Sequence, residues 1–225
     1  TGIDEMIVGS TKEDLSLEKR VALTPETAKN IIGLGLKIVI EKNYADHIGI
    51  KDKEYESAGV EIKNSSNEVL EVSNLLIKVN FPSASDLSKM KQKTILVGML
   101  NPKKNFEKIK ELLDKKISLF SLELLPRITR AQSMDVLSSQ SNLAGYRSVI
   151  DSIYEFEKAI PMMMTAAGTV PAAKVLVIGA GVAGLQAIAT AKRLGAIVSA
   201  TDVRAASKEQ VESLGGKFLT VEQNE

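Results

Sequence analysis

The sequence predicts an α/β protein built from two Rossmann-like parallel-sheet domains, and three observations support this. Apolar runs of strand length alternate with helical patterns over residues 6–124, as in parallel sheets covered on both faces. A glycine-rich turn joins an apolar run to a helix at residues 174–184, as in the first βα unit of a dinucleotide-binding domain. The 225 residues are 44% hydrophobic and 25% charged, which suffices for two hydrophobic cores.

The first predicted domain spans residues 1–125 and alternates short strands with short helices. Its clearest helix start is Thr24-Pro25-Glu26, where a capping hydroxyl precedes a proline at the first helical position and an acid near the positive end of the dipole. The predicted strands are 6–9, 36–41, 75–79, 94–99 and 117–124, and the predicted helices are 24–34, 52–58, 66–72 and 106–115.

A connecting loop and long helix are predicted over residues 126–164. Pro126 breaks the pattern and opens the loop, and the helix is expected from Met134 to Lys158. Apolar residues recur at helical spacing in its second half, so we expect them to be buried. This stripe comprises Tyr146, Val149, Ile150, Ile153 and Tyr154. The methionines at 162–164 are expected to fill the core.

Residues 165–225 are predicted to form the first half of a dinucleotide-binding Rossmann domain. Val175–Ile178 is expected to be a strand buried on both faces of a parallel sheet. A helix from Val182 to Leu194 follows it, and further strands are expected at 197–200 and near 217. These elements make one βαβαβ half, so we expect this domain to be incomplete at the C-terminus.

The three glycines of the turn have separate physical roles. Gly179 permits the tight turn, Gly181 lets a pyrophosphate approach the backbone, and Gly184 lets the helix pack on the strand. The helix then directs unpaired N–H groups and the positive end of its dipole at the pyrophosphate. Asp202, 18 residues after the last glycine, is placed to accept both ribose hydroxyls of an adenosine.

A membrane-spanning helix is the competing interpretation of the same stretch. Val175–Ala191 covers 17 residues, and Gln186 is its only strongly polar side chain. A span needs about 20 residues, and glycines lower helix propensity. The nucleotide-binding turn is therefore favoured.

Composition excludes several kinds of site. The 29 Lys and Arg residues are interspersed with 28 Asp and Glu residues, for a net charge of +1, so no surface for nucleic acid is expected. The absence of cysteine excludes disulfides and thiolate chemistry. The single histidine, His47, lies in a loop-like stretch. We therefore expect no metal site and no histidine general base.

Hydrogen-bonding side chains gather in the predicted loop. Arg127, Gln132, Asp135 and Ser138 lie within 12 residues, directly after a predicted strand, where open α/β sheets bind ligands. The first turns of the following helix carry small side chains, up to Gly145. Small side chains allow either a ligand or a neighbouring helix to come close, and we favour the ligand.

Several motifs together resemble one family. The loop run is Pro126-Arg-Ile-Thr-Arg-Ala-Gln-Ser-Met-Asp-Val-Leu-Ser-Ser-Gln-Ser-Asn-Leu-Ala-Gly-Tyr-Arg147. Supporting motifs are Arg20-Val-Ala-Leu-Thr-Pro25, Pro161-Met-Met-Met-Thr-Ala-Ala-Gly168, Ala189-Thr-Ala-Lys-Arg-Leu-Gly195, Thr201-Asp-Val-Arg204 and Lys208-Glu-Gln-Val-Glu-Ser-Leu-Gly-Gly216. With them the chain resembles the NAD(H)-binding domain, in the alpha subunit, of the proton-translocating NAD(P) transhydrogenases, within the alanine dehydrogenase/transhydrogenase family.

The resemblance implies an oxidoreductase that is active only with partner domains. It would pass hydride between NADH on this chain and NADP on a separate domain, coupled to proton translocation through a membrane part. The resemblance also implies a homodimer at the cytoplasmic (or matrix) face of an energy-transducing inner membrane, attached only through its partners.

The resemblance assigns site residues as well. Arg127, Gln132 and Asp135 would line the nicotinamide end of NAD(H) as the catalytic residues, and Ser138 and Tyr146 would lie at the same site. Further cofactor contacts are implied for Ile128, Thr129, Gly179, Ala180, Gly181, Val182, Gly184, Asp202, Val203 and Arg204.

Charge predicts a preference for NAD(H) over NADP(H). The ionised Asp202 would face the 2′-phosphate of NADP(H), and such a like-charge contact is costly. Arg204 lies beyond the strand end, so we expect it not to offset Asp202.

The required chemistry agrees with the resemblance. Moving hydride between two nicotinamide C4 atoms releases no proton, so the site needs two rings held face to face without water rather than a general acid or base.

Alanine dehydrogenase is the nearest alternative, and it shares the Arg20–Pro25 opening. That family oxidises an amino acid with a histidine base, where this chain has Asn101. Lys78 and Arg20, the counterparts of its carboxylate-handling residues, remain, so this alternative implies a degraded substrate pocket around them. A non-catalytic NAD-binding module is a further alternative, which the Arg127–Asp135 loop disfavours.

Overall fold

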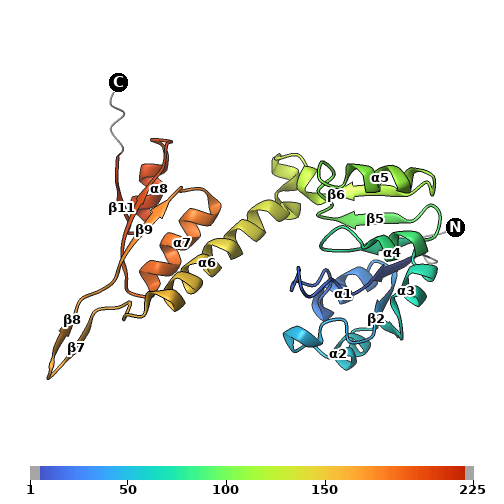
Figure 1. Cartoon of the computed structure of the whole chain (residues 1–225), viewed down its shortest axis with the longest axis horizontal. Helices are drawn as coiled ribbons and strands as arrows, with labels where there is room; N and C mark the ends of the chain where they lie inside the picture. Colours follow the sequence, from blue (N-terminus) through green and yellow to red (C-terminus); the bar gives the residue numbers. More distant parts are fainter. Residues whose placement is uncertain (1–5, 221–225) are drawn as a thin grey trace. The chain divides into compact units, whose positions relative to one another are not determined.

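The computed structural model describes residues 6–220. The chain separates into two compact units, unit 1 (Thr1–Met134) and unit 2 (Asp135–Glu225), and each unit contains a parallel sheet (Figure 1). The predicted α/β class is therefore confirmed.

Unit 1 is built on a six-stranded sheet in which every neighbouring pair is parallel. Its strands are β1 (Ile7–Ser10), β2 (Lys37–Glu41), β3 (Glu61–Lys63), β4 (Leu75–Ile77), β5 (Ile95–Gly98) and β6 (Ser118–Ser121). Their order is β3-β2-β1-β4-β5-β6, so the strand order reverses between β1 and β4. In such doubly wound sheets, ligands bind beyond the carboxyl ends of the strands at the reversal point.

Short helices connect these strands, and α1 begins as the sequence predicts. The Thr24 hydroxyl accepts the N–H of Thr27 at 3.2 Å, and Pro25 occupies the first turn. The helices of unit 1 are α1 (Pro25–Ile32), η2 (Asp46–Ile48), α2 (Asp52–Ser57), α3 (Ser66–Val72), α4 (Ala84–Lys89), α5 (Phe106–Leu113), η3 (Leu122–Leu124) and η4 (Thr129–Met134). The sequence patterns missed β3, α4 and the 3-10 helices η2, η3 and η4. The predicted strand 117–124 is too long, because its last three residues form η3.

The central strands carry the core of unit 1. Ile38, Val39 and Ile40 of β2 are each at most 2% exposed, as expected where both faces of a parallel sheet are covered. Tyr55 of α2 is fully buried against this sheet, and its hydroxyl donates to the carbonyl oxygen of Leu23 at 2.6 Å.

Unit 2 begins with the long predicted helix, α6 (Val136–Phe156). The antiparallel hairpin β7 (Met163–Thr165) and β8 (Gly168–Val170) follows. The remaining elements are β9 (Lys174–Ile178), α7 (Val182–Arg193), β10 (Ile197–Thr201), α8 (Ser207–Ser213) and β11 (Lys217–Phe218). The last three strands form a parallel sheet in the order β11-β10-β9, which is a βαβαβ arrangement.

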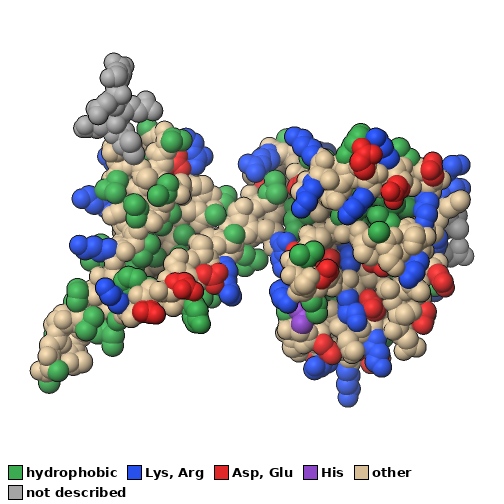
Figure 2. Space-filling view, in the orientation of Figure 1, with side chains coloured by type: hydrophobic (Ala, Val, Ile, Leu, Met, Phe, Trp, Pro, Cys, Tyr) green, Lys and Arg blue, Asp and Glu red, His purple; other side chains and the backbone are tan. Residues whose placement is uncertain are grey.

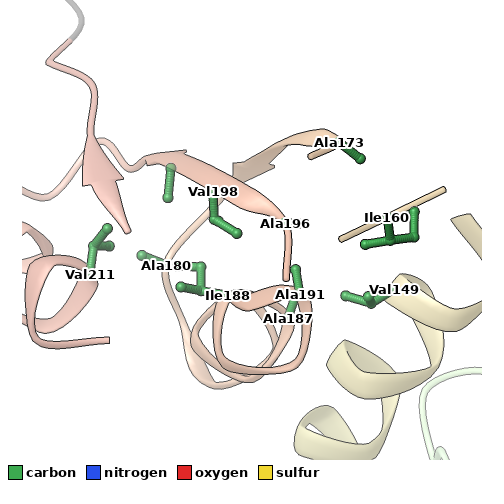
Figure 3. Close-up of a cluster of buried hydrophobic side chains, with 11 residues drawn as sticks. Val149, Ile160, Ala173, Ala180, Ala187, Ile188, Ala191, Ala196, Val198 and Val211 are labelled. Atoms are coloured by element: carbon green, nitrogen blue, oxygen red, sulfur yellow. The ribbon is translucent and has the colours of Figure 1, made fainter. Parts of the chain in front are cut away.

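The core of unit 2 lies between this sheet and its helices (Figure 3). Helix α6 contributes Val149, and α7 contributes Ile188 and Ala191. Helix α6 can approach α7 closely because residue 145 is glycine: a Cβ atom there would overlap the carbonyl oxygen of Ala183. Helix packing, which the sequence left as the alternative, therefore accounts for Gly145.

Part of the predicted stripe on α6 is not buried. Val149 is 6% exposed, but Tyr146 and Tyr154 are 50% and 84% exposed. Gly145 and Val149 lie on the side of α6 that packs in unit 2, and at 3.6 residues per turn Tyr146 and Tyr154 point to other sides of the helix.

Two further burial predictions are wrong. Met162, Met163 and Met164 are 58%, 50% and 71% exposed, because Met163 and Met164 lie on the hairpin and Met162 directly precedes it, outside the core. In β9, Leu176 and Ile178 are 55% and 80% exposed. One face of this strand packs on the core of unit 2, and its other face is open among the described residues.

The membrane-helix interpretation is also excluded. Val175–Ala191 forms most of β9, the glycine turn and most of α7, not one helix. Among residues 6–220, no helix combines the length and apolarity that crossing a bilayer requires.

Candidate nucleotide-binding site

The glycine turn between β9 and α7 has the geometry that its sequence predicts. Gly179 has a φ of 98°, in the left-handed region that favours glycine. A Cβ atom at Gly184 would overlap the carbonyl oxygen of Gly179, so only glycine lets α7 pack this close to the turn. At Gly181, the nearest atom to an added Cβ is Nη2 of Arg204, at 3.9 Å, so the backbone there is open to a ligand.

The N-terminus of α7 faces this open turn. Gly181 is the N-cap residue, and no side chain caps the helix. The first backbone bond of the helix runs from the N–H of Leu185 to the carbonyl oxygen of Gly181 at 2.9 Å. The N–H groups that precede Leu185 have no partner within the helix and suit an anionic ligand. Val182, in this first turn, is 47% exposed.

Asp202 directly follows β10, and its carboxylate is tied to the turn. It accepts the N–H of Ala180 at 2.7 Å and the N–H of Arg204 at 2.8 Å. Its side chain is 6% exposed. Ala180 is itself 2% exposed, so only its backbone can take part in a site. Val203, by contrast, is fully exposed.

Arg204 lies closer to Asp202 than the sequence suggested. Its Nε and Nη2 atoms each donate to Asp202 at 3.0 Å. The side chain therefore folds back over the strand end and contacts the carboxylate, and the effect of this contact on nucleotide preference stays a prediction. The Arg204 guanidinium is the main cause that holds the pKa of the Asp202 carboxyl well below its usual value, and the N–H groups of Ala180 and Arg204 lower it further. Asp202 is thus ionised at neutral pH.

The predicted loop residues divide between the two units. Arg127, Ile128, Thr129 and Gln132 belong to unit 1 and are all exposed. The loop is anchored at Ala131, which is 6% exposed and donates its N–H to the carbonyl oxygen of Ile128 at 2.9 Å. The side chains around this anchor are therefore presented to solvent.

Asp135 and Ser138 lie together at the start of unit 2. Asp135 is the N-cap residue of α6 and accepts the N–H of Ser138 at 2.9 Å and its hydroxyl at 2.6 Å. A capping role therefore accounts for both residues, whatever else they contact. Tyr146, further along the same helix, is half exposed.

A charged cluster in unit 1 was only partly predicted. Lys78 and Thr11 follow the adjacent strands β4 and β1, at the reversal point of the sheet. Lys78 Nζ donates to the carbonyl oxygen of Lys12 at 2.7 Å and lies 3.5 Å from the Glu13 carboxylate. The side chains of Lys78 and Glu13 are 3% and 6% exposed, so this is a buried ion pair.

Arg20, like Lys78, is paired with a carboxylate of the same unit. Its Nε and Nη2 atoms donate to the two oxygens of Glu18 at 2.8 and 2.7 Å. This contact lowers the pKa of Glu18 below its usual value. Sequence reasoning found both cations but missed Glu13 and Glu18. The only signal was the presence of three acids, Glu13, Asp14 and Glu18, in the irregular stretch before Arg20.

Asn101 follows β5 and has a φ of 44°. Its backbone N–H donates to a Glu123 carboxylate oxygen. An amide side chain cannot take a proton at neutral pH, so this position offers no general base.

Two family models match most of the chain. Residues 9–144 match the model described as "Alanine dehydrogenase/PNT, N-terminal domain", and residues 148–225 match "Alanine dehydrogenase/PNT, C-terminal domain". These matches confirm the resemblance that the motifs indicated.

Individual relatives agree with the family models. An NAD(P) transhydrogenase subunit alpha protein of Rhodospirillum rubrum is 50% identical over 222 residues, which are 96% of this chain and 58% of that protein. An alanine dehydrogenase of Methanococcus maripaludis is 31% identical, over 96% of this chain and 58% of that protein. The crystal structure of transhydrogenase from Sinorhizobium meliloti is 51% identical and has a TM-score of 0.91, over 95% of this chain and 64% of that one.

The chain spans 58% of the length of these two curated relatives. The two matched family models together cover the predicted loop and the glycine turn. The chain therefore belongs to the alanine dehydrogenase/PNT family and is a homologue of transhydrogenase alpha subunits.

Proposed function

We propose that this chain is the NAD(H)-binding part of a proton-translocating NAD(P) transhydrogenase. The observation that carries the proposal is the glycine turn tied to an ionised carboxylate through the Ala180–Asp202 bond of 2.7 Å. A dinucleotide needs these two features side by side, one for its pyrophosphate and one for its adenosine ribose. The 50% identity with a transhydrogenase alpha subunit supports the assignment.

The residues that fit NAD(H) fall into three groups. The backbone at Gly179, Gly181 and Gly184, with Ala180 and Val182, suits the pyrophosphate. Asp202, with Val203 and Arg204, suits the adenosine ribose. The nicotinamide end is assigned to the loop and to α6, with Arg127, Gln132 and Asp135 as the catalytic residues beside Ile128, Thr129, Ser138 and Tyr146.

Bound NAD(H) would supply a hydride at nicotinamide C4, exchanged with NADP(H) on a partner domain. The chain's own role is to bind and orient the ring and to exclude water. A side chain that moves a proton is not required, which agrees with Asn101 following β5. Coupling to proton translocation and attachment to the cytoplasmic (or matrix) face of an energy-transducing membrane would both come through partner domains.

Hydride exchange tests this function directly. The chain, extended to the full length of its relatives, is mixed with an NADP-binding transhydrogenase domain, and NADH oxidation with NADP⁺ reduction is followed. We expect exchange, and we expect Gln132→Asn to slow it by about 100-fold, because a shorter side chain misplaces the ring by about 1 Å. NADH affinity should change little.

The same assay separates the alternatives. A non-catalytic NAD-binding module would bind NADH but exchange no hydride. An alanine dehydrogenase would oxidise NADH with pyruvate and ammonia and without any partner domain. We expect no such activity, because Lys78 and Arg20 are paired with the chain's own carboxylates, Glu13 and Glu18, and no base follows β5. If the Gln132→Asn variant exchanged hydride at the normal rate, Gln132 would have only a structural role.

We expect NAD(H) to bind at least about 10-fold more tightly than NADP(H). Ribose hydroxyls can donate to the ionised Asp202, whereas a 2′-phosphate would repel it. Arg204 reduces the difference, since its guanidinium contacts the same carboxylate. Calorimetric titration with both nucleotides gives the ratio. Asp202→Asn should bring the two affinities closer, and equal affinities in the unaltered chain would contradict the prediction.

A homodimer is part of the proposal, and the hairpin β7–β8 supports it. Figure 1 shows the hairpin extending away from the sheet and α7 of unit 2, and Figure 2 shows hydrophobic side chains on it. Met163, Met164 and Val170 are 50%, 71% and 48% exposed. A two-stranded hairpin alone is marginally stable in water, so an apolar one is expected to pack on a second copy.

Substituting both Met163 and Met164 by serine should weaken this dimer by at least about 10-fold, because two buried methionines would be lost from the interface. Sedimentation velocity over a concentration series measures the effect. Leu34→Ser is the matched control, since Leu34 is 72% exposed in unit 1. An unchanged dimer in the methionine variant would exclude the hairpin from the interface.

A further inference from the structure

The carboxylate of Asp202 has no acceptor position to spare. A carboxylate offers about four lone-pair positions. Two are taken by the backbone N–H groups of Ala180 and Arg204, at 2.7 and 2.8 Å. The other two are taken by Nε and Nη2 of Arg204, each at 3.0 Å. Each carboxylate oxygen thus accepts one backbone donor and one guanidinium donor.

The two kinds of donor differ in what can displace them. The N–H of Ala180 belongs to the glycine turn, and the N–H of Arg204 belongs to the chain directly after Asp202, so the backbone fixes both. The Arg204 side chain is 62% exposed and can move without disturbing the core. A ribose diol that donates to both oxygens of Asp202 must therefore take the places of Nε and Nη2.

The released guanidinium stays close to the glycine turn. Its Nη2 atom lies 3.9 Å from the position of a Cβ atom at Gly181. That glycine is where the backbone is open to the pyrophosphate. A cation at this place is available to an anion on the turn, and hydrogen bonds between charged groups are the strong ones.

We propose that Arg204 is a specificity-determining residue that occupies the ribose positions of Asp202 and transfers to the pyrophosphate when a nucleotide binds. The inference deepens the proposed NAD(H) binding and rests on it. Binding of a diol alone is opposed, because it breaks two guanidinium bonds without replacing them. Binding of a diol joined to a diphosphate is not opposed, because the guanidinium gains a new partner. Arg204 thus selects nucleotides over nucleosides.

The test compares adenosine with ADP by calorimetric titration of the chain. Adenosine carries the diol without an anion, and ADP carries both. In Arg204→Ala we expect adenosine to bind about 3-fold more tightly and ADP about 10-fold more weakly. The ratio of the two affinities should therefore fall by about 30-fold. Arg204→Lys keeps the charge but loses the two-pronged contact, so adenosine should tighten while ADP binding is largely retained.

Controls make the outcomes distinct. Arg193→Ala removes an exposed arginine from the last turn of α7 and should change neither affinity. Thermal unfolding of each variant verifies that unit 2 is intact. If Arg204→Ala weakens or leaves unchanged the binding of adenosine, the inference is overturned while NAD(H) binding stands. If the unaltered chain binds neither ADP nor NADH, the proposed function fails and the inference fails with it.

Discussion

Gly184→Ala is expected to destabilise unit 2 by about 3 kcal/mol or more and to abolish nucleotide binding. The added Cβ would overlap the carbonyl oxygen of Gly179, and overpacking against fixed atoms costs about 1–3 kcal/mol or more. The carbonyl cannot easily turn away, because Gly179 is held at a φ of 98° by the tight turn. The α7 N-terminus would therefore shift, together with the N–H groups assigned to the pyrophosphate.

Gly181→Ala is the matched control, and it should show the opposite pattern. Gly181 has a φ of −79°, which alanine adopts freely, and an added Cβ has no atom closer than 3.9 Å. The change should be neutral or stabilising by up to about 1 kcal/mol, yet block the approach of a pyrophosphate to the backbone. Hydrogen exchange of α7 and β9 amides, with NADH titration, separates the two effects. Equal stability of the two variants would contradict the assigned roles of these glycines.

Local sequence patterns were sufficient for elements whose structure is decided by residues that lie close together in the sequence. The glycine turn was predicted because Gly179 and Gly184 are required by the backbone of the turn itself. The start of α1 was predicted because its cap is contained in Thr24, Pro25 and Thr27. The helix at Ser66–Val72 was predicted with its observed bounds. None of these elements depends on a distant contact for its signal.

The patterns failed where the structure is decided by a contact between residues far apart in the sequence, or by the lack of such a contact. Strand β3 has only three residues, Glu61–Lys63, and two of them are charged, so no alternation was visible. The apolarity of Met162–Met164 says nothing about whether another element covers them. The predicted stripe placed Tyr154 on the core face of α6, but no described element covers it. Burial is a property of the neighbour as much as of the residue.

The candidate site likewise combines features that follow from local sequence with features that depend on contacts between distant residues. Asp202 was singled out as a ribose ligand from its spacing after the turn, and the structure adds a bond to the N–H of Ala180 that the sequence did not predict. The fold-back of Arg204 onto Asp202 was missed, because sequence position does not say which way a long side chain points. Glu13 was missed for another reason: its partner, Lys78, is 65 residues away and is brought to it only by the pairing of β1 with β4.

Lys78→Met is expected to destabilise unit 1 by about 3–5 kcal/mol, the usual effect of removing one member of a buried ion pair. Lys78 and Glu13 have side chains only 3% and 6% exposed. Loss of the ammonium leaves the Glu13 carboxylate without its cation and the Lys12 carbonyl oxygen without its donor at 2.7 Å. Glu13 cannot turn to solvent, because it also accepts the N–H of Val79 at 2.6 Å.

A double-mutant cycle distinguishes the lost pair from lost packing. Glu13→Gln removes the charge and keeps an oxygen for Val79, so the double variant should be more stable than Lys78→Met alone. Lys110→Met is the exposed control: the Lys110 side chain is 52% exposed in its pair with Glu107, and its loss should cost less than about 1 kcal/mol. Urea unfolding followed by hydrogen exchange assigns each loss to a unit, and α7 should keep its protection in all four variants. A cost for Lys78→Met as small as that for Lys110→Met would mean that water reaches the Lys78–Glu13 pair, and that the reversal point of the first sheet is open.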